Sequence, residues 1–525
     1  MTDLITHRMT LPTAGAVLVV LAALGYRLLK PKPLKGIPHN PITSILGDIP
    51  EITEILKKGD KTLYDYYEVL VGRHGPVTQL CVGNNSMLVL ADPAEADRLV
   101  VKGKNVEATK FLGIIYSRLI PNAQISLPAN DMWKLHRRMF GPMLSQEHLS
   151  RMVNHISIYA MGLVELWDAK LKLGEGKSFN AMVDIKLAVM DAIGHVTLGS
   201  SLGCVEGAQK SLSVPRSTSN QVVEFDGEAT PPIYDAMIAL FTHLGNAPML
   251  PMISITFPIY TWLSRSWRSS KKLARGFIDQ KIEGAKRRDS NEGDCILDTI
   301  IRREKEEGQK LTREELLDEL LLMFIGGQDT TSATLFWFVK YMPSDPDIQQ
   351  QLHDEVCSVF GDDMSGLTLD ALKDSERVPV LEAVVAETLR CAMVGGAIGK
   401  YLAEDEVILG RHVPKGTGII VATGLMGMDE SAWGPDAKQW RPARWLRPDG
   451  SFDPHAGPSG HPFGLGKRSC FGERLAIVKL KVFISVLSRA FRFQPVPEQV
   501  GSMHAVAVVS RQPKQCYVSL DKWET

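Results

Sequence analysis

The residue with the most distinctive chemistry is Cys470, which lies in the segment Phe463-Gly464-Leu465-Gly466-Lys467-Arg468-Ser469-Cys470-Phe471-Gly472. An ionised thiol is a strong metal ligand, and the glycines let the backbone pass close to the sulfur, so that N–H groups can point at it. A helical pattern starts at Glu473, and the positive end of that helix favours the ionised sulfur. Arg468 can meet an anionic group with two donors. The segment therefore predicts a metal-binding thiolate beside an anion.

A second chemical segment, Gly326-Gly327-Gln328-Asp329-Thr330-Thr331, lies inside a long apolar helix that we predict to begin near Thr312. Two glycines in a helix interior cost about 1 kcal/mol each relative to alanine, which indicates a close approach to the backbone. A threonine pair can also bond to the carbonyl four residues earlier and distort the helix. The resulting groove could hold a diatomic ligand, with Asp329 and Thr330 relaying protons through water. The alternative is a helix packing seam with a polar stripe.

Two further helical segments carry charged pairs. Glu387 and Arg390 are three residues apart and share a helix face, while Arg444 follows in Trp440-Arg441-Pro442-Ala443-Arg444-Trp445. Trp133 and Arg137 are four residues apart and also share a face. Taken alone, the first pattern is frequent by chance and the second is also typical of an exposed basic helix.

Together these segments resemble the cytochrome P-450 family, the haem-thiolate monooxygenases. The Cys470 segment matches the family's haem-binding loop at every defining position, and residues 326–331 match its oxygen-binding helix. Four motifs occur in the expected order, and the resemblance covers nearly all of residues 30–525. It implies haem b as the cofactor and Cys470 as the axial ligand of its iron.

The resemblance also implies roles for the other residues. Asp329 and Thr330 would be the catalytic proton carriers, while Glu387, Arg390 and Arg444 would form a buried structural network. The remaining haem-binding positions are implied to be Trp133, Arg137, Lys400, Phe463 and Arg468. One departure from the family pattern is the stretch 391–400, which has three glycines where a proline is usual. It normally lines the substrate pocket, so we expect a roomier wall there.

Composition excludes some classes of function and constrains the compartment. The chain has 525 residues, with 59 basic and 60 acidic side chains, and this balance gives no sign of a nucleic-acid partner. The seven cysteines are scattered without a CxxC pair, which favours a reducing compartment.

The N-terminus contains a charge-free apolar run at residues 9–26, near the minimum length of a membrane-spanning helix. Arg27, Lys30, Lys32 and Lys35 follow it, so the positive-inside rule places the rest of the chain in the cytosol. A cleavable signal peptide and a buried core helix are the alternatives. We predict a membrane anchor at 1–29, a proline-rich linker at 30–41 and one catalytic domain at 42–525, on the endoplasmic reticulum.

The periodicity of apolar residues predicts a mainly helical fold with small β-sheets near the N-terminal third and the end. A hairpin is predicted at 77–90, and the least ordered stretch at 205–230. The clearest predicted helices are Asp131–Phe140, Met152–Leu171, Arg313–Met342, Pro346–Phe360, Pro379–Arg390 and Glu473–Phe491.

The resemblance implies a monooxygenase that inserts one oxygen atom from O2 into a lipophilic small molecule. Electrons would come from NADPH through a separate diflavin reductase, because the chain has no flavin or nicotinamide motif. Several short segments resemble filamentous-fungal members, many of which tailor terpenoids, polyketides or alkaloids. We expect the reductase to dock on an exposed patch formed by Lys134, His136, Arg138 and Lys467.

Three other functions stay open at this point. The first is a haem-thiolate isomerase or dehydratase, which tends to lack the acid–alcohol pair. The second is a haem-binding sensor or carrier without enzymatic activity. The third is a cysteine hydrolase in which His455 or His461 serves Cys470 as the base.

Overall fold

The structure is a computed structural model. It describes residues 20, 25–27, 30–83, 85–103, 105–108, 110–227, 229–250, 252–287, 295–308, 310–457 and 460–523. Most of the predicted membrane span at 9–26 lies outside these residues. Within the described ranges, no helix is both long and apolar enough to cross a membrane.

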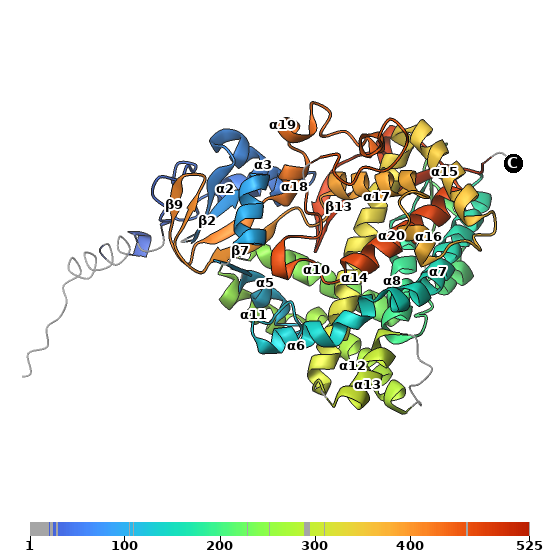
Figure 1. The fold of residues 1–525 in the computed structure, drawn as a ribbon, viewed down its shortest axis with the longest axis horizontal. Helices are drawn as coiled ribbons and strands as arrows, with labels where there is room; N and C mark the ends of the chain where they lie inside the picture. Colours follow the sequence, from blue (N-terminus) through green and yellow to red (C-terminus); the bar gives the residue numbers. More distant parts are fainter. Residues whose placement is uncertain are drawn as a thin grey trace, which may run out of the picture.

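Most of the molecule is a helical body with one large hydrophobic core (Figure 1). Its long central helix is α14 (Arg313–Tyr341), which begins with a capping box at Thr312 and Glu315. Helices α8 (Met182–Leu198), α17 (Pro379–Ala392) and α20 (Glu473–Ala490) pack against α14. Most side chains along α14 are buried, as expected for a helix that other helices surround.

The remaining helices surround this centre. Helix α7 (Gln146–Leu173) packs against α8 and α20, and α12 (Arg265–Arg287) covers the first half of α14. The others are α2 (Ile49–Lys57), α3 (Leu63–His74), α4 (Pro93–Ala96), α5 (Lys110–Tyr116), α6 (Asp131–Phe140), α9 (Cys204–Ser211), α10 (Pro232–Asn246), α11 (Ile253–Leu263), α13 (Ile296–Glu307), α15 (Pro346–Phe360), α16 (Leu369–Lys373), α18 (Thr423–Gly427) and α19 (Glu430–Trp433).

A five-stranded sheet forms a second lobe beside the helical body, at the left of Figure 1. Its order is β1 (Val77–Val82), β2 (Asn85–Leu90), β10 (Gly418–Val421), β7 (Ile398–Leu402) and β3 (Val106–Ala108). Strands β1 and β2 are an antiparallel hairpin that pairs Val77 with Leu90, whereas β10 runs parallel to β2. This sheet has its own hydrophobic cores, separate from the large core of the helical body.

The other sheets are small. One contains β11 (Arg492–Gln494), β14 (Tyr517–Asp521) and β4 (Phe179–Asn180), and a hairpin joins β12 (Ala505–Ala507) to β13 (Arg511–Pro513). Two more pairs are β5 (Arg216–Ser217) with β6 (Val223–Glu224), and β8 (Glu406–Ile408) with β9 (Arg411–Val413). The predicted mainly helical fold with small sheets is therefore confirmed, although the stretch expected to be least ordered contains most of α9.

Candidate active site

The Cys470 segment is a tight loop that ends where α20 begins. The Cys470 N–H donates to the Phe463 carbonyl at 2.8 Å, and the Ser469 N–H donates to the Gly466 carbonyl at 2.9 Å. Gly466 has φ +70°, and a Cβ atom there would lie 2.4 Å from the Val100 carbonyl oxygen. This position therefore needs glycine for its backbone conformation and for the close approach of Val100.

Cys470 is exposed to solvent, while every other described cysteine is buried or half-buried. Protein atoms nevertheless crowd it, and burial raises the pKa of the Cys470 thiol above its ordinary value. The Gly472 N–H, Arg137 and Lys479 act in the opposite direction without overcoming burial. The expected backbone donor to the sulfur is present, but the helix terminus alone does not ionise the thiol. A bound cation is what would keep this sulfur ionised.

Helix α14 has an accessible strip in the middle of its buried length. Gly326 and Thr330 lie one turn apart, and both are exposed although their neighbours in the helix are largely buried. The Thr330 hydroxyl donates to the Gly326 carbonyl at 2.6 Å, as the sequence predicts. Open space therefore adjoins α14 at this turn. Gly327 serves another purpose, because a Cβ atom there would lie 2.6 Å from the Ile193 side chain of α8.

Asp329 points away from this strip. Its buried carboxylate accepts a hydrogen bond at 2.6 Å from the hydroxyl of Ser510, in the turn between β12 and β13. Burial raises the pKa of Asp329, although Ser510 and Lys186 partly offset the shift. The two residues predicted to carry protons are thus neighbours in sequence, but their side chains have different partners. Ser510 is a site residue that the sequence analysis missed, since only the fold brings it to α14.

Several cations gather next to the Cys470 loop. The guanidinium of Arg468 lies over the Trp133 ring at 4.3 Å, and that of Arg137 lies 5.3 Å from the same ring and 4.9 Å from Phe471. Burial lowers the pKa of Arg468 to about 10, and the nearby Arg137 contributes to this shift. Lys400 on β7 is buried, and burial together with Arg468 lowers its pKa to about 8. Such mutual repulsion favours an anion at this point.

The hydrogen bonds of these cations leave room for such an anion. Arg468 donates to the carbonyls of Gln124 at 3.0 Å and Leu127 at 2.8 Å, while Arg137 donates to the Lys467 and Ser469 carbonyls, each at 3.1 Å. The Nε atom of Arg468 is buried and has no hydrogen-bond partner among the residues that the structure describes. A buried donor without an acceptor is costly, so an acceptor that arrives with a ligand would satisfy it.

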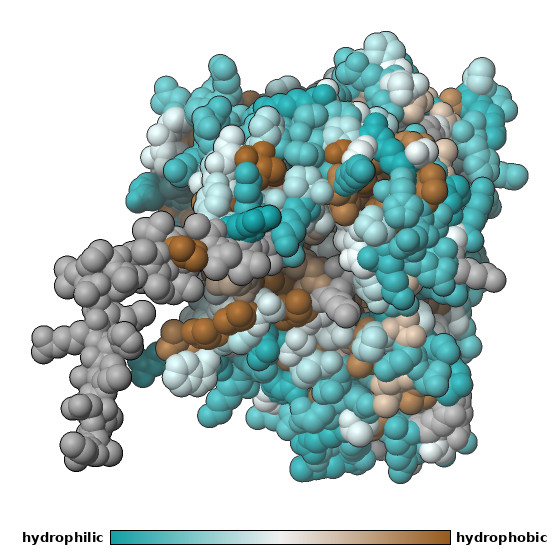
Figure 2. Space-filling view, turned by 90° about the vertical axis from the view of Figure 1, so that its left-hand side faces the viewer, coloured by the Kyte–Doolittle hydropathy of each residue, from teal (hydrophilic) through white to brown (hydrophobic). Residues whose placement is uncertain are grey.

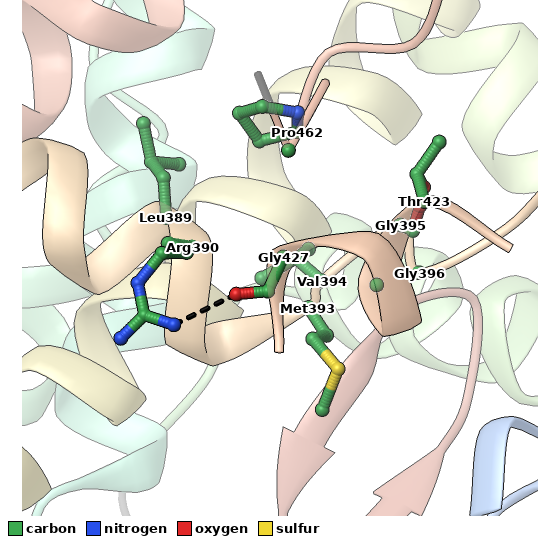
Figure 3. Close-up of a pocket in the computed structure, with 11 residues that line it drawn as sticks. Leu389, Arg390, Met393, Val394, Gly395, Gly396, Thr423, Gly427 and Pro462 are labelled. Atoms are coloured by element: carbon green, nitrogen blue, oxygen red, sulfur yellow. Dashed lines mark hydrogen bonds between the residues drawn. The ribbon is translucent and has the colours of Figure 1, made fainter. Parts of the chain in front are cut away.

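The predicted network around Glu387 is present. Arg390 donates to both Glu387 oxygens, at 2.7 and 2.6 Å, and Arg444 Nε donates at 2.9 Å. Burial by itself would raise the pKa of Glu387, but the hydrogen bonds and charge of Arg390 hold it below the ordinary value. Arg390 also donates to the Gly427 carbonyl at 2.7 Å (Figure 3). The network therefore ties α17 to the segment that precedes the Cys470 loop.

The glycine-rich stretch after α17 does not form the roomy wall that we expected. A Cβ atom on Gly424 would lie 3.1 Å from Gly396 Cα, and one on Gly396 would lie 3.2 Å from the Tyr64 ring. Two chain segments cross closely here, and the cavity beside them, partly drawn in Figure 3, is only about 30 Å³. That volume suits a single water molecule.

The loop at residues 117–130 is held by acidic residues of α14 that the sequence analysis missed. Asp318 accepts from the Asn122 backbone N–H at 2.8 Å, and Glu319 accepts from that of Gln124 at 2.6 Å. His136, expected to be exposed, is fully buried, with Nδ1 2.6 Å from a Glu319 oxygen. It therefore does not belong to a docking patch, because the fold uses it to join α6 to α14.

The comparison with known proteins is decisive for the family. The family model for cytochrome P450 matches residues 40–520. The chain belongs to the cytochrome P450 family. It is therefore an oxidoreductase of a family that binds haem through a cysteine thiolate and, in general, receives electrons from a redox partner.

Among individual cytochromes P450, the chain is 26% identical to the monooxygenase GME11363 of Pestalotiopsis microspora, over 98% of this chain and 99% of that protein. It is 26% identical to the monooxygenase TRI13 of Fusarium sporotrichioides, over 96% and 98%. It is 23% identical to ganoderic acid synthetase CYP5150L8 of Ganoderma lucidum, over 92% and 93%.

The residues of this cytochrome P450 fit a haem. The sulfur of the exposed residue Cys470 is a suitable iron ligand, and the cations Arg137, Arg468 and Lys400 suit the two carboxylates of the cofactor. The specific observation is the Nε of Arg468, a buried donor for which the described part of the chain supplies no acceptor. Trp133 would pack beside these guanidiniums and shield them from water.

Proposed function

We propose that this protein is a haem-thiolate monooxygenase that inserts one oxygen atom from O2 into a lipophilic small molecule, by hydroxylation or epoxidation. The proposal further assigns it a tailoring step in fungal secondary metabolism. Its main support is the exposed residue Cys470 before the start of α20, next to a cluster of cations in which the buried Nε of Arg468 has no hydrogen-bond partner among the described residues. The fungal relatives, one of them named for the synthesis of ganoderic acid, support the metabolic assignment.

In this proposal Cys470 holds the haem iron, and Phe463 closes the loop behind it through its carbonyl. When bound, the haem supplies the chemistry of oxygen activation, which thiolate donation favours. The Gly472 N–H donates to the sulfur and so limits the electron density that the thiolate gives to the iron. Arg137, Arg468 and Lys400 hold the carboxylates of the cofactor. Glu387, Arg390 and Arg444 keep the segment before the loop in place.

Thr330 and Asp329 would manage protons on the other side of the site. The hydroxyl of Thr330 lies on the accessible strip of α14. While it donates to the Gly326 carbonyl, its oxygen can still accept a hydrogen bond from a proton donor. Asp329 reaches the same strip only if its carboxylate leaves Ser510. We therefore assign Thr330 the direct contact with the reacting groups, and Asp329 the role of a reserve acid whose raised pKa suits proton delivery.

We also propose that the protein works at the surface of the endoplasmic reticulum, anchored by residues 1–29 with the catalytic domain in the cytosol. Helix α11 supports this location, because Met252, just before it, and Ile255, Ile259, Trp262 and Leu263 are all more than half exposed. Figure 2 shows hydrophobic side chains among hydrophilic ones on the face that is at the left of Figure 1. A helix of this kind can lie in the membrane interface and admit lipophilic molecules.

A basic groove next to α11 fits the same location. Its volume is about 470 Å³, and it lies between α11, the start of α12 and the segment after α5. The cations that line it are Arg118, Arg268, Lys271, Lys272 and Arg275. Cations beside an apolar helix attract anionic lipid headgroups.

The electron donor would be an NADPH-dependent diflavin reductase, docked on the exposed residues Lys134, Arg138 and Lys467. Charge reversal by Arg138→Glu should lower reductase-supported NADPH consumption at low salt, since acidic partners dock by charge. Lys172→Glu, an exposed reversal on α7, is the control and should have no effect. Equal rates in both variants would remove Arg138 from the docking surface.

The first experiment is the carbon monoxide difference spectrum of the reduced, solubilised full-length protein. We expect a strongly red-shifted Soret band that is lost in Cys470→Ala and kept in Cys357→Ala, a half-buried cysteine on α15. A band that persists in Cys470→Ala would refute the assignment of the ligand. Protein without haem would instead favour the cysteine hydrolase.

The second experiment separates the monooxygenase from the other haem proteins. Reductase and NADPH are supplied together with isotopically labelled O2, and lipophilic terpenoids, polyketides and alkaloids are screened. Incorporation of one labelled oxygen atom supports the proposal. A rearranged or dehydrated product without the label would favour the isomerase or dehydratase, and no turnover of any compound would favour the sensor.

A further inference from the structure

Helix α20 carries two buried lysines, Lys479 and Lys481, that have different electrostatic partners. The Lys481 ammonium donates to the Leu372 carbonyl at 2.6 Å and forms an ion pair with Glu382. The Lys479 ammonium donates to the Gly327 carbonyl of α14 at 2.5 Å. Only 1% of Lys479 is exposed, so water cannot solvate its charge. Both lysines are buried on the same helix, so substitutions at the two positions can be compared directly.

Lys479 has no carboxylate partner among the residues that the structure describes. Burial lowers the pKa of Lys479 to about 7, and the one group that acts in the opposite direction is Cys470. Lys479 in turn is among the groups that lower the pKa of Cys470. A buried ammonium is costly unless an opposite charge compensates it. Among the described residues, the Cys470 sulfur is the group that can compensate the charge of Lys479, once a bound iron keeps that sulfur ionised.

The other end of this interaction is the accessible turn of α14. Two successive carbonyls there accept side-chain donors, Gly326 from Thr330 and Gly327 from Lys479. A Cβ atom on Gly327 would lie 3.3 Å from the Lys479 nitrogen and 2.6 Å from Ile193, so the backbone is held between α20 and α8. The position of Thr330 therefore depends on the contact made by Lys479.

We propose that Lys479 is a positioning residue for the reaction: its buried charge faces the Cys470 thiolate while its hydrogen bond to Gly327 fixes the turn of α14 that carries Thr330. This inference rests on the proposed function, since it requires Cys470 as the iron ligand. Two properties follow. The charge of Lys479 stabilises the reduced iron, and its hydrogen bond keeps the Gly326–Thr330 turn ordered.

Two substitutions separate the charge from the hydrogen bond. Lys479→Gln removes the charge but can still donate to Gly327, and Lys479→Met removes both at similar volume. Lys481→Gln is the matched control, because it deletes a buried lysine of α20 whose charge is paired with Glu382. Each variant is studied as the full-length, haem-loaded protein.

The first measurement is the reduction potential of the haem, by titration with dithionite and redox dyes. Loss of a nearby positive charge disfavours the ferrous state. We expect Lys479→Gln and Lys479→Met each to shift the ferrous-to-ferric ratio about threefold or more toward ferric, which is about 28 mV for a one-electron couple. Lys481→Gln should leave the potential unchanged.

The second measurement is hydrogen exchange of the α14 peptide at residues 322–331. We expect exchange to be about tenfold faster in Lys479→Met than in wild type, and nearly unchanged in Lys479→Gln, because the glutamine keeps the bond to Gly327. A purely structural lysine would lower thermal stability in Lys479→Met and Lys481→Gln alike and would leave the potential unchanged.

The outcomes separate this inference from the proposed function. If wild-type protein lacks the red-shifted carbon monoxide band, the proposed function itself fails. If the band is present but neither Lys479 variant shifts the reduction potential, the proposed electrostatic interaction between Lys479 and the Cys470 thiolate is refuted. If the potential shifts but exchange at 322–331 is unchanged in Lys479→Met, the positioning of α14 is refuted.

Discussion

Glu387 gives the sharpest prediction about stability, because one carboxylate satisfies five donors. It accepts two hydrogen bonds from Arg390, one from Arg444, one from the Arg441 backbone and one from Trp445. The side chains of Arg390 and Arg444 are only 3% and 6% exposed, so neither guanidinium can turn to water. In Glu387→Gln the amide NH2 group would face some of these donors, Arg390 would lose its counter-charge, and Arg444 would keep only its ion pair with Asp436.

The expected cost follows from this geometry. Removing one partner of a buried ion pair typically costs about 3–5 kcal/mol, and the total stability of a folded domain is about 5–15 kcal/mol. We expect Glu387→Gln to lose about 3–5 kcal/mol in urea unfolding at pH 7, followed by circular dichroism, and to retain haem poorly. Glu68→Gln is the control, since its pair with Lys438 spans 2.8 Å but is more than half exposed. Such a surface pair contributes about 1 kcal/mol or less.

The pH dependence of the same variant supplies a second check. Arg390 holds the folded-state pKa of Glu387 below its ordinary value, so the folded protein binds the proton less tightly than the unfolded chain does. The stability from this group is therefore present above the unfolded pKa of about 4.3 and is lost as the pH falls through the lower, folded value. Glu387→Gln should lack this acid-dependent component. A variant within about 1 kcal/mol of wild type at pH 7 would refute the reasoning.

Three further predictions concern the loop, the central helix and the cofactor. Gly466→Ala should destabilise the protein by about 1–2 kcal/mol through its left-handed backbone alone, and the clash of the new Cβ atom with the Val100 carbonyl adds a further cost. Gly472 has open space around it, so Gly472→Ala is the control and should unfold like wild type in urea. Asp329→Asn should be more stable than wild type at neutral pH but not in acid. Burial raises the folded-state pKa of Asp329, so the stability of the wild type falls as the pH rises through that value. If this is wrong, the urea midpoints of the two proteins will change in parallel from pH 4 to 8. Arg468→Gln should release haem to apomyoglobin about tenfold faster, the effect of losing one charge-assisted hydrogen bond, and an unchanged rate would exclude it from the haem site.

Local signals predicted the helices whose ends are encoded in their own sequence. Helices α6 and α15 have the predicted bounds, because Asn130 and Asp345 cap their first turns and a glycine follows each last residue. Helix α7 begins six residues before the prediction, at Gln146, since its first turns are polar and its start depends on the cap by Ser145. Capping is thus a more accurate guide to these boundaries than apolar periodicity.

Tertiary contacts determined the parts that the sequence did not reveal. Helix α9 lies where an irregular stretch was predicted, and the Asp191 carboxylate of α8 accepts from the N–H groups of Cys204 at 3.1 Å and Val205 at 2.9 Å. No residue adjacent to α9 encodes that cap. The parallel pairing of β10 with β2 is equally non-local, since it joins segments more than 300 residues apart.

The same distinction holds for the site. The Cys470 loop is contiguous, so its glycines and its helix could be predicted from the sequence. The charge network around Glu387 was implied by the family resemblance, because the spacing of Glu387 and Arg390 alone is frequent by chance. The partners of α14 were not readable: Ser510, which binds Asp329, and His136, which binds Glu319, are each more than 180 residues away in sequence. A charged residue in an otherwise buried helix was the one available signal for Asp318 and Glu319.

Two connections join the Cys470 loop and helix α20, which follows it, to α14, and their arrangement determines how the site responds to its cofactor. Lys479 reaches Gly327 directly. Arg468 reaches the carbonyls of Gln124 and Leu127, and Glu319 of α14 holds Gln124 from the other side. A carboxylate of the cofactor that binds Arg468 Nε would therefore add an acceptor without breaking these contacts, because that atom has no other partner. Cofactor binding should then tighten the loop at 117–130 and α14 together, since both share the groups that bind it.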